Sequence, residues 1–184
     1  HTYQEVGCDA LRNRLLLVAS GGLWEYRLTD RVRRKMTPMW WPTWNPGGGL
    51  VVVDGLTDRI IAITRGQAGV TRGAYIAPIA SLEAPSNPWV LTETFGSTLL
   101  PGPNIYGTIS QARRTLYVLS YSGTVSAGLA YSLDAGGFTA LPIDPALGAA
   151  AVPVCEYGDV ADRVLCLSQS PGGGQPTPAR LFSY

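Results

Sequence analysis

A chain of 184 residues with a hydrophobic share of 46% is long enough for one packed domain and too apolar for a disordered segment. Its net charge of +1 gives no strong field toward nucleic acid or an anionic membrane surface. No apolar run approaches the roughly 18 residues of a membrane span. We therefore expect a globular chain without a nucleic-acid partner and without a membrane-spanning segment.

The predicted elements begin with a group of four short strands. Their residues are mostly β-branched, aromatic or apolar, and glycine, proline and Asx residues separate them. They are "QEVGCDAL" (4–11), "NRLLLVAS" (13–20), "GLWEYRLTD" (22–30) and the aromatic stretch "MTPMWWP" (36–42). A short basic run, Arg31, Arg33, Arg34 and Lys35, is expected on a solvated edge strand.

The same order of strands recurs along the chain. The second group begins at "GLVVVDGL" (49–56), the third at "NIYGTISQ" (104–111) and the fourth at "VPVCEYGDV" (152–160). The first apolar residues of the second strands follow one another at steps of 45, 56 and 48 residues: Leu15, Ile60, Leu116 and Val164. This quasi-period of about fifty residues indicates a repeat architecture.

Each repeat predicts a four-stranded antiparallel meander with two apolar faces, and one meander cannot bury both faces alone. Stacking the meanders face to face around an axis buries them and produces a β-propeller. We therefore expect an all-β fold that is a single β-propeller domain or propeller arc over residues 1–184. Its four-stranded blades are expected at about 1–45, 46–94, 95–145 and 146–184.

Two of the repeats resemble the Kelch family. "LLLVASGGLWEYRLTD" (15–30) carries the double glycine Gly21-Gly22, and "LYVLSYSGTVSAGLAYSLDAGGFTALPI" (116–143) carries later Kelch positions. These later positions are Tyr131, Asp134, Phe138 and Leu141-Pro142. The second repeat departs from the pattern with "TRGQAG", and Phe138 stands where the family has tryptophan. The start "CDALRNRLLLV" also resembles the blade opening of four-bladed hemopexin-like domains, whose Tyr-Trp-Arg feature is absent from the middle repeats.

The last repeat is expected to be incomplete, because no fourth strand follows "ARLFSY" (179–184) and only three residues precede the first strand. Its third strand would be an unpaired edge, which is a template for another chain. Four explanations stay open: a fragment of a longer propeller, an edge filled by a second subunit, a ring completed by another molecule, or a small ring with a three-stranded blade. We expect a protein partner or self-association at this edge, with Phe182 and Tyr184 among the contact residues.

Three of the five tryptophans lie together at Trp40, Trp41 and Trp44, in the link between the first two blades. In one interpretation, Trp40 or Trp41 packs between blades, as the Kelch resemblance implies, and Pro42 and Pro46 stiffen the link. In the other, Trp44 and a neighbour are exposed and bind a sugar face, a proline-rich peptide or the apolar patch of a partner.

Metal and nucleophilic chemistry find little support in the sequence. The single histidine, His1, cannot supply the two histidine ligands of a copper radical oxidase, the known enzyme type with Kelch-like blades. The three cysteines, Cys8, Cys155 and Cys166, fit no zinc spacing. We expect Cys155 and Cys166 to face each other across a hairpin, as a disulfide or as two buried thiols. No cofactor and no metal are expected.

Paired carboxylates are the remaining catalytic option. Asp9, Asp54 and Glu156 lie at similar places on the innermost strands, which line the channel of a propeller. A glycosidase pair needs carboxyl groups about 5 to 9 Å apart. The alternative is that these acids are solvated or pair with arginines such as Arg12, Arg59 and Arg163.

The sequence therefore favours a non-catalytic interaction or structural module, a Kelch-like propeller in a larger extracellular or cell-surface assembly. The alternative is a carbohydrate-binding or carbohydrate-processing protein that uses exposed tryptophans and channel acids. Because the chain opens at His1 and not at methionine, we also expect a cleavage or an excision upstream.

Overall fold

The computed structural model describes residues 5–19, 22–36, 49–64, 71–96, 99–100, 104–122, 124–143, 151–158, 163–169 and 180–183. They belong to two compact units, His1–Thr94 and Phe95–Tyr184, and each unit is described by itself. The prediction that residues 1–184 form one domain stays a prediction. Within the described ranges, no helix has the length and hydropathy needed to cross a membrane.

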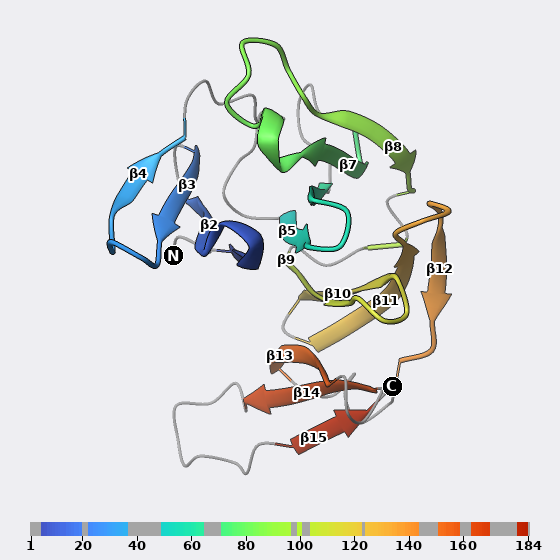
Figure 1. Ribbon diagram of the computed structural model, residues 1–184. Helices are drawn as coiled ribbons and strands as arrows, with labels where there is room; N and C mark the ends of the chain where they lie inside the picture. The colour runs from blue at the N-terminus through green and yellow to red at the C-terminus, as the bar shows by residue number, and fades with distance from the viewer. Residues whose placement is uncertain are drawn as a thin grey trace. The chain divides into compact units, whose positions relative to one another are not determined.

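Antiparallel sheets whose strands follow one another along the chain make up both units (Figure 1). In the first unit, blade 1 consists of β1 (Glu5–Asp9), β2 (Arg14–Ala19), β3 (Gly22–Arg27) and β4 (Arg33–Lys35). Blade 2 consists of β5 (Gly49–Asp54), β6 (Arg59–Thr64), β7 (Gly73–Pro78) and β8 (Val90–Thr94). Two short 3-10 helices, η1 (Ala10–Arg12) and η2 (Ile79–Ser81), follow β1 and β7.

The second unit repeats this plan. Blade 3 consists of β9 (Asn104–Ser110), β10 (Thr115–Ser122), β11 (Thr124–Ser132) and β12 (Phe138–Leu141). In blade 4 the described strands are β13 (Ala151–Gly158), β14 (Arg163–Gln169) and β15 (Arg180–Ser183), in the order β13-β14-β15. The described part of the last sheet thus has three strands, in agreement with the predicted incomplete blade.

A left-handed residue shapes the first hairpin of blades 1, 2 and 3. Asn13, Asp58 and Arg114 have φ angles of 49°, 53° and 50°, and each directly precedes the second strand of its blade. Asn and Asp adopt this region more readily than other non-glycine residues, which suits the Asx-containing hairpins expected from the sequence. In each blade, the carbonyl of this residue accepts a backbone hydrogen bond from the residue after the third strand, at distances of 2.9, 3.0 and 2.9 Å: Leu28, Ile79 and Leu133.

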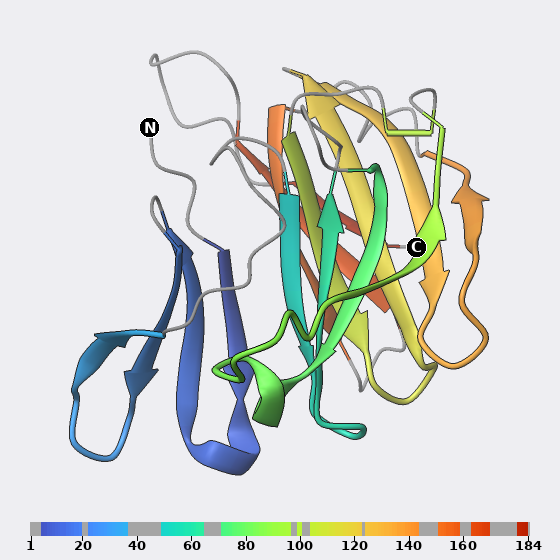
Figure 2. The same cartoon turned by 90° about the horizontal axis from the view of Figure 1, so that it is seen from above.

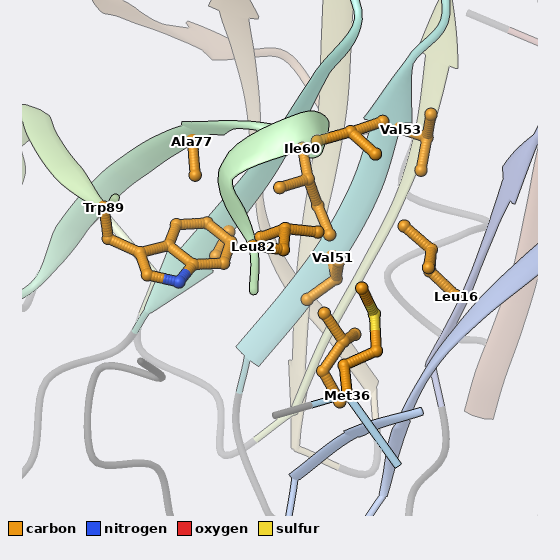
Figure 3. Packing of buried hydrophobic residues seen from close by; sticks show 11 residues of the cluster. Leu16, Met36, Val51, Val53, Ile60, Ala77, Leu82 and Trp89 are labelled. Carbon is orange, nitrogen blue, oxygen red and sulfur yellow. The ribbon is translucent and has the colours of Figure 1, made fainter. Parts of the chain in front are cut away.

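Apolar side chains from blades 1 and 2 meet in one core cluster (Figure 3). We call the face of blade 1 that carries Leu16, Leu23 and Met36 its forward face; these side chains are 0%, 3% and 2% exposed. They pack with residues of blade 2: Val51, Val53, Ile60, Ala62, Ala77, Ile79, Leu82 and Trp89. Because burial of one large aliphatic side chain is worth about 1.5–3 kcal/mol, this packing is the main stabilisation between the two blades.

Gly7 lets the inner strands β1 and β5 approach each other closely. A Cβ atom at Gly7 would lie 2.8 Å from Cγ2 of Val53, which is closer than van der Waals contact permits. Gly7 is itself buried. The glycine in "QEVGCDAL" therefore serves the packing of neighbouring blades rather than a turn.

Aromatic residues near the outer strands pack much as the repeat pattern predicts. Trp89, just before β8, is 9% exposed and belongs to the core cluster between blades 1 and 2. In blade 3, Phe138 lies 4.8 Å from the ring centroid of Tyr131 and 5.1 Å from that of Phe95. Phe138 thus belongs to an aromatic cluster at the place where the Kelch resemblance implies tryptophan.

The close approach of β1 and β5 predicts that even a methyl group added at Gly7 lowers the stability of the fold. We expect Gly7→Ala to lower the free energy of unfolding by about 1–3 kcal/mol, because the new methyl group overpacks the contact with Val53. Urea unfolding measures the change. Gly55→Ala is the matched control, since a Cβ atom there meets no atom within 4 Å, and it should be neutral. Equal effects of the two substitutions would contradict the close approach.

Candidate functional site

The inner strands of blades 1 and 2 end in buried aspartates. Asp9 and Asp54 are 2% and 0% exposed, and each lies opposite an arginine in the strand register, Arg14 and Arg59. Nε of Arg14 donates to Oδ2 of Asp9 at 2.8 Å, and Nη2 of Arg59 donates to Oδ2 of Asp54 at 3.2 Å. Both aspartates are therefore held by an arginine of their own blade.

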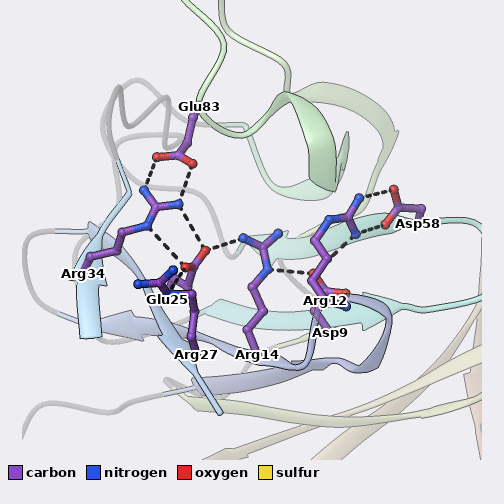
Figure 4. Close-up of polar contacts among 8 residues, drawn as sticks. All are labelled: Asp9, Arg12, Arg14, Glu25, Arg27, Arg34, Asp58 and Glu83. Atoms are coloured by element: carbon purple, nitrogen blue, oxygen red, sulfur yellow. Dashed lines mark hydrogen bonds and ion pairs between the residues drawn. The ribbon is translucent and has the colours of Figure 1, made fainter. Parts of the chain in front are cut away.

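Arg14 extends this pairing into a buried ionic network (Figure 4). Nη1 of Arg14 donates to Oε2 of Glu25 at 2.5 Å, and Glu25 is only 3% exposed. Glu25 also accepts from Nη2 of Arg34 at 3.2 Å. Glu25 on β3 and Arg34 on β4 are register partners, so their side chains lie on the same face of blade 1.

Two arginines carry the network from blade 1 to blade 2. Arg12 forms a forked pair with Asp58, with Nη1–Oδ1 at 2.5 Å and Nη2–Oδ2 at 2.7 Å. Arg34 forms a similar fork with Glu83, with distances of 2.5 and 2.8 Å. Figure 2 shows η1 and the β5–β6 hairpin at the same end of the first unit, where the Arg12 fork joins them.

The forked ion pairs shift the pKa values of Asp58, Arg12 and Arg34. The hydrogen bond from Arg12 lowers the pKa of Asp58 below its usual value, because it stabilises the carboxylate. The same bond raises the pKa of Arg12, and the hydrogen bonds to Glu83 and then Glu25 raise that of Arg34. These directions keep Asp58, Arg12 and Arg34 charged at neutral pH.

Exposed apolar side chains lie next to this network, at the tips of the hairpins. Leu11 and Leu56 each follow the inner-strand aspartate by two residues and are 71% and 68% exposed. Leu28, whose amide is bound to the Asn13 carbonyl, is 42% exposed. We call Leu11, Leu28 and Leu56 the hairpin-tip surface.

The network engages the inner-strand aspartates of blades 1 and 2. Asp9 and Asp54 are each bound to an arginine, as the second interpretation of the sequence expected, whereas the pairing of Glu156 stays a prediction. Among the described residues, no group of three or more His, Cys, Asp or Glu side chains is placed to hold a metal ion. The arrangement joins blades 1 and 2.

The other predicted site residues are only partly within the described chain. Trp40, Trp41, Trp44 and Tyr184 lie outside the described residues. Phe182 lies on β15 opposite Cys166, and Glu156 lies on β13 opposite Leu165. Their binding or catalytic roles stay predictions.

The cysteines lie as the hairpin prediction requires. Cys155 and Cys166 are partners in the register of β13 and β14, so they face each other across the hairpin. The choice between a disulfide and two thiols stays open. Cys8 is a free, exposed cysteine.

Sequence reasoning missed the links between blades. An aspartate followed after five positions by an arginine, Asp9–Arg14 and Asp54–Arg59, was a local signal for the pairs within each blade. The Arg12–Asp58 and Arg34–Glu83 pairs join residues that are 46 and 49 positions apart. No local spacing in the sequence predicts such distant ion pairs.

Comparison with known proteins supports the fold. No family model matches the chain, and no curated protein matches its sequence. Solved structures do match. A structural genomics protein of unknown function from Bacteroides thetaiotaomicron has a TM-score of 0.55 at 17% identity, over 98% of this chain and 43% of that chain. An auxiliary nutrient binding protein from the same organism has a TM-score of 0.58 at 12% identity, over 96% of this chain and 40% of that chain.

TolB from Acinetobacter baumannii has a TM-score of 0.51 at 12% identity, over 97% of this chain and 44% of that chain. The chain therefore spans about two fifths of the length of each of these proteins. The fold is an all-β propeller of four-stranded antiparallel blades, as the sequence predicted. The Kelch family is not confirmed by these likenesses.

The buried part of the network predicts a large cost for removing Arg14. Arg14→Met leaves the buried carboxylates of Asp9 and Glu25 with fewer partners, and we expect a loss of about 3 kcal/mol in the free energy of unfolding. Urea unfolding measures it. Arg33→Met is the control, because Arg33 is exposed and its described contact is the ring of Trp24 at 4.8 Å. It should cost less than about 1 kcal/mol. A neutral Arg14→Met would contradict the network.

The Arg12–Asp58 fork predicts a pH dependence. Because the pKa of Asp58 is lowered in the folded state, its contribution is present above the unfolded pKa of about 3.9 and is lost as the pH falls through the folded pKa. Asp58→Asn should lower stability at pH 7 by less than about 1 kcal/mol, since the pair is exposed and screened. The difference from the wild type should fade below about pH 4.

The control for this pH dependence is the same substitution in an Arg12→Gln background, where the partner of Asp58 is gone. There, unfolding curves between acid and neutral pH should show a much smaller effect of Asp58→Asn, because only the weaker attraction of Arg14 still lowers the pKa of Asp58. A pH-dependent difference of unchanged size without Arg12 would mean that Arg12 is not the main cause of the lowered pKa.

Proposed function

We propose that this chain is a non-catalytic interaction module that takes part in a larger assembly through its propeller blades. The observation that carries the proposal is the exposure of Leu11 and Leu56, at 71% and 68%, on neighbouring hairpins. A leucine gains about 1.5–3 kcal/mol when it is fully buried, so both side chains favour contact with an apolar surface.

The Arg12–Asp58 fork makes this surface suited to binding. It joins η1, which carries Leu11, to the hairpin that carries Leu56. Because the two hairpins are already held together, less conformational entropy is lost when a partner binds. Arg27 and Asp30, paired at 2.9 Å, add charges of both signs nearby. An apolar centre with a mixed-charge rim is typical of protein–protein contacts.

The inner-strand acids support the non-catalytic part of the proposal. Asp9 and Asp54 are tied to Arg14 and Arg59, so their carboxylate oxygens are already engaged in ion pairs within their own blades. An extracellular or cell-surface location remains part of the proposal, as the sequence analysis expected.

A carbohydrate-binding or carbohydrate-processing role is the second candidate. One of the similar structures is named an auxiliary nutrient binding protein, and the Trp40, Trp41 and Trp44 stretch offers rings that stack on sugars. Titration of the chain with oligosaccharides, followed by tryptophan fluorescence, tests this candidate. Saturable quenching that Trp44→Ala removes would favour it, and turnover abolished by Asp54→Asn would overturn the non-catalytic proposal.

Selection of peptides from a random displayed library against the chain tests the interaction surface. We expect apolar peptides whose affinity falls at least tenfold in the double variant Leu11→Asp, Leu56→Asp. This loss corresponds to about 1.4 kcal/mol, less than the burial of one leucine. The matched control is Ala112→Asp, at the equivalent exposed position of the blade 3 hairpin, and it should leave binding unchanged. Peptides that bind all three proteins equally would overturn the role of the hairpin-tip surface.

A further inference from the structure

The outermost strand of blade 1 forms a basic sheet edge. In the described chain, β4 (Arg33–Lys35) pairs with β3 alone, because it ends the sheet order β1-β2-β3-β4 (Figure 1). All three of its residues are exposed. The outer strands of blades 2 and 3, β8 and β12, have the sequences VLTET and FTAL and carry no cation. Among these three described outer strands, β4 is therefore the one that attracts anions.

Two hydrogen bonds at the ends of β4 define its pairing with β3. The amide of Arg27 donates to the carbonyl of Val32 at 2.9 Å, and the amide of Met36 donates to the carbonyl of Leu23 at 3.0 Å. Along an antiparallel ladder, residue pairs that exchange hydrogen bonds alternate with pairs that do not. These two bonded pairs lie four positions apart on each strand, so a third bonded pair lies midway between them.

This middle pair is Glu25 and Arg34, which are register partners. The backbone groups of Arg34 therefore point toward β3. Those of its neighbours Arg33 and Lys35 point the other way, toward the edge of the sheet, because successive residues alternate in direction. Each of the two neighbours thus offers one N–H donor and one C=O acceptor to a strand that lies beside β4.

The side chains of Arg33 and Lys35 share one face of the blade with two aromatic rings. In the register, Arg33 lies opposite Tyr26, and Lys35 lies opposite Trp24. The guanidinium carbon of Arg33 is 4.8 Å from the ring centroid of Trp24. An arginine stacked on a ring keeps its N–H edge available for a carboxylate. The ring also restricts the side chain, so less entropy is lost when a carboxylate binds.

The positive charge of this edge is not neutralised by the described chain. Arg31, Arg33 and Lys35 are exposed and have no carboxylate partner among the described residues, whereas Arg34, on the other face, is held by two glutamates. Like charges opposite each other are destabilising, so this edge disfavours pairing with a second β4 strand. The same charges favour a strand that carries carboxylates at the opposite positions.

We propose that β4 binds an extended acidic peptide segment as an added antiparallel strand of blade 1. The outward backbone groups of Arg33 and Lys35 bond to the segment, and their side chains pair with two of its carboxylates. Because the two cations are two positions apart, the segment that they recognise has the pattern acid–x–acid. None of these groups belongs to the hairpin-tip surface, and this inference goes beyond the function proposed for that surface.

Fluorescence anisotropy with labelled octapeptides tests the proposal. The probe is ETETETET, which presents glutamates on one face of an extended strand. We expect saturable binding with a Kd below about 1 mM. The control EETTEETT has the same composition and charge but no acid–x–acid pattern, and QTQTQTQT has the pattern without the charge. Both should bind at least tenfold more weakly, and equal binding of EETTEETT would overturn the recognition of a strand.

Reversal of the charge on β4 gives a gain of function that misfolding cannot produce. The double variant Arg33→Glu, Lys35→Glu should lose ETETETET at least tenfold and should bind KTKTKTKT, which the wild type should not bind. The matched control Arg33→Lys, Lys35→Arg keeps both charges and should retain ETETETET. A charge-reversed chain with unchanged circular dichroism that does not bind KTKTKTKT would overturn the role of these two side chains.

Methylation of the peptide backbone tests strand pairing without any variant of the protein. Glutamates that lie opposite Arg33 and Lys35 in an antiparallel pair exchange backbone hydrogen bonds with them. ETETETET with N-methylated glutamates should therefore not bind. The same peptide with N-methylated threonines should bind as the unmodified probe does, because those amides point away from β4. Equal affinities of the two methylated peptides would overturn the added strand.

Two further measurements separate this edge from other binding modes. A thymidine octanucleotide should bind at least tenfold more weakly than ETETETET, and equal binding would show a general polyanion surface and overturn the proposal. The double variant Leu11→Asp, Leu56→Asp should keep ETETETET, because its changes lie on the hairpin tips. Loss of ETETETET in that variant, with unchanged circular dichroism, would place the peptide on the hairpin-tip surface and overturn the proposal as well.

Discussion

The structure depends on one constraint: a four-stranded sheet with apolar side chains on both faces must have a neighbour on each side. The packing of Leu16, Leu23 and Met36 of blade 1 on Val53 and Ile60 of blade 2 meets this need at one boundary. Gly7 permits the contact, because any Cβ atom at its position would collide with Val53.

The ionic network adds to this packing and determines how blades 1 and 2 are aligned. Burial of charges costs desolvation energy that offsets most of the attraction, so Arg14, Asp9 and Glu25 add little net stability as a set. A register that separated them would leave buried charges unpaired, and this penalty selects the observed alignment. The more exposed forks of Arg12 with Asp58 and of Arg34 with Glu83 then fix blade 2 against blade 1.

Much of the fold could be predicted from the sequence, because it depends on local patterns. The repeat of about fifty residues, the apolar strands and the Asx hairpins follow from alternation and turn chemistry, and the register of Cys155 with Cys166 followed in the same way. The expectation that the basic run lies on a solvated edge strand was confirmed in part, since Arg33–Lys35 form the exposed outer strand β4, paired with Trp24, Glu25 and Tyr26. Of the aromatic stretch expected after it, residues 37–42 lie outside the described residues.

The candidate site was less predictable. Pairing of the inner-strand acids with arginines was one of two interpretations, and the aspartate–arginine spacing supported it. The links between blades were not predictable, because Arg12 and Asp58 come together only through the approach of two hairpins. The exposure of Leu11 and Leu56 could not be predicted either. An apolar residue next to a strand is predicted to be buried unless the end of the strand is known.

The amino-acid sequence by itself determined the type and number of blades, since strand alternation, hairpin residues and the repeat are encoded in neighbouring positions. Only the tertiary structure decided which faces of blades 1 and 2 pack on each other, which charges meet and which of their leucines remain exposed. The physical reason is that inter-blade packing depends on the distance and orientation of whole sheets. A local pattern therefore shows that a face is apolar but not what lies against it.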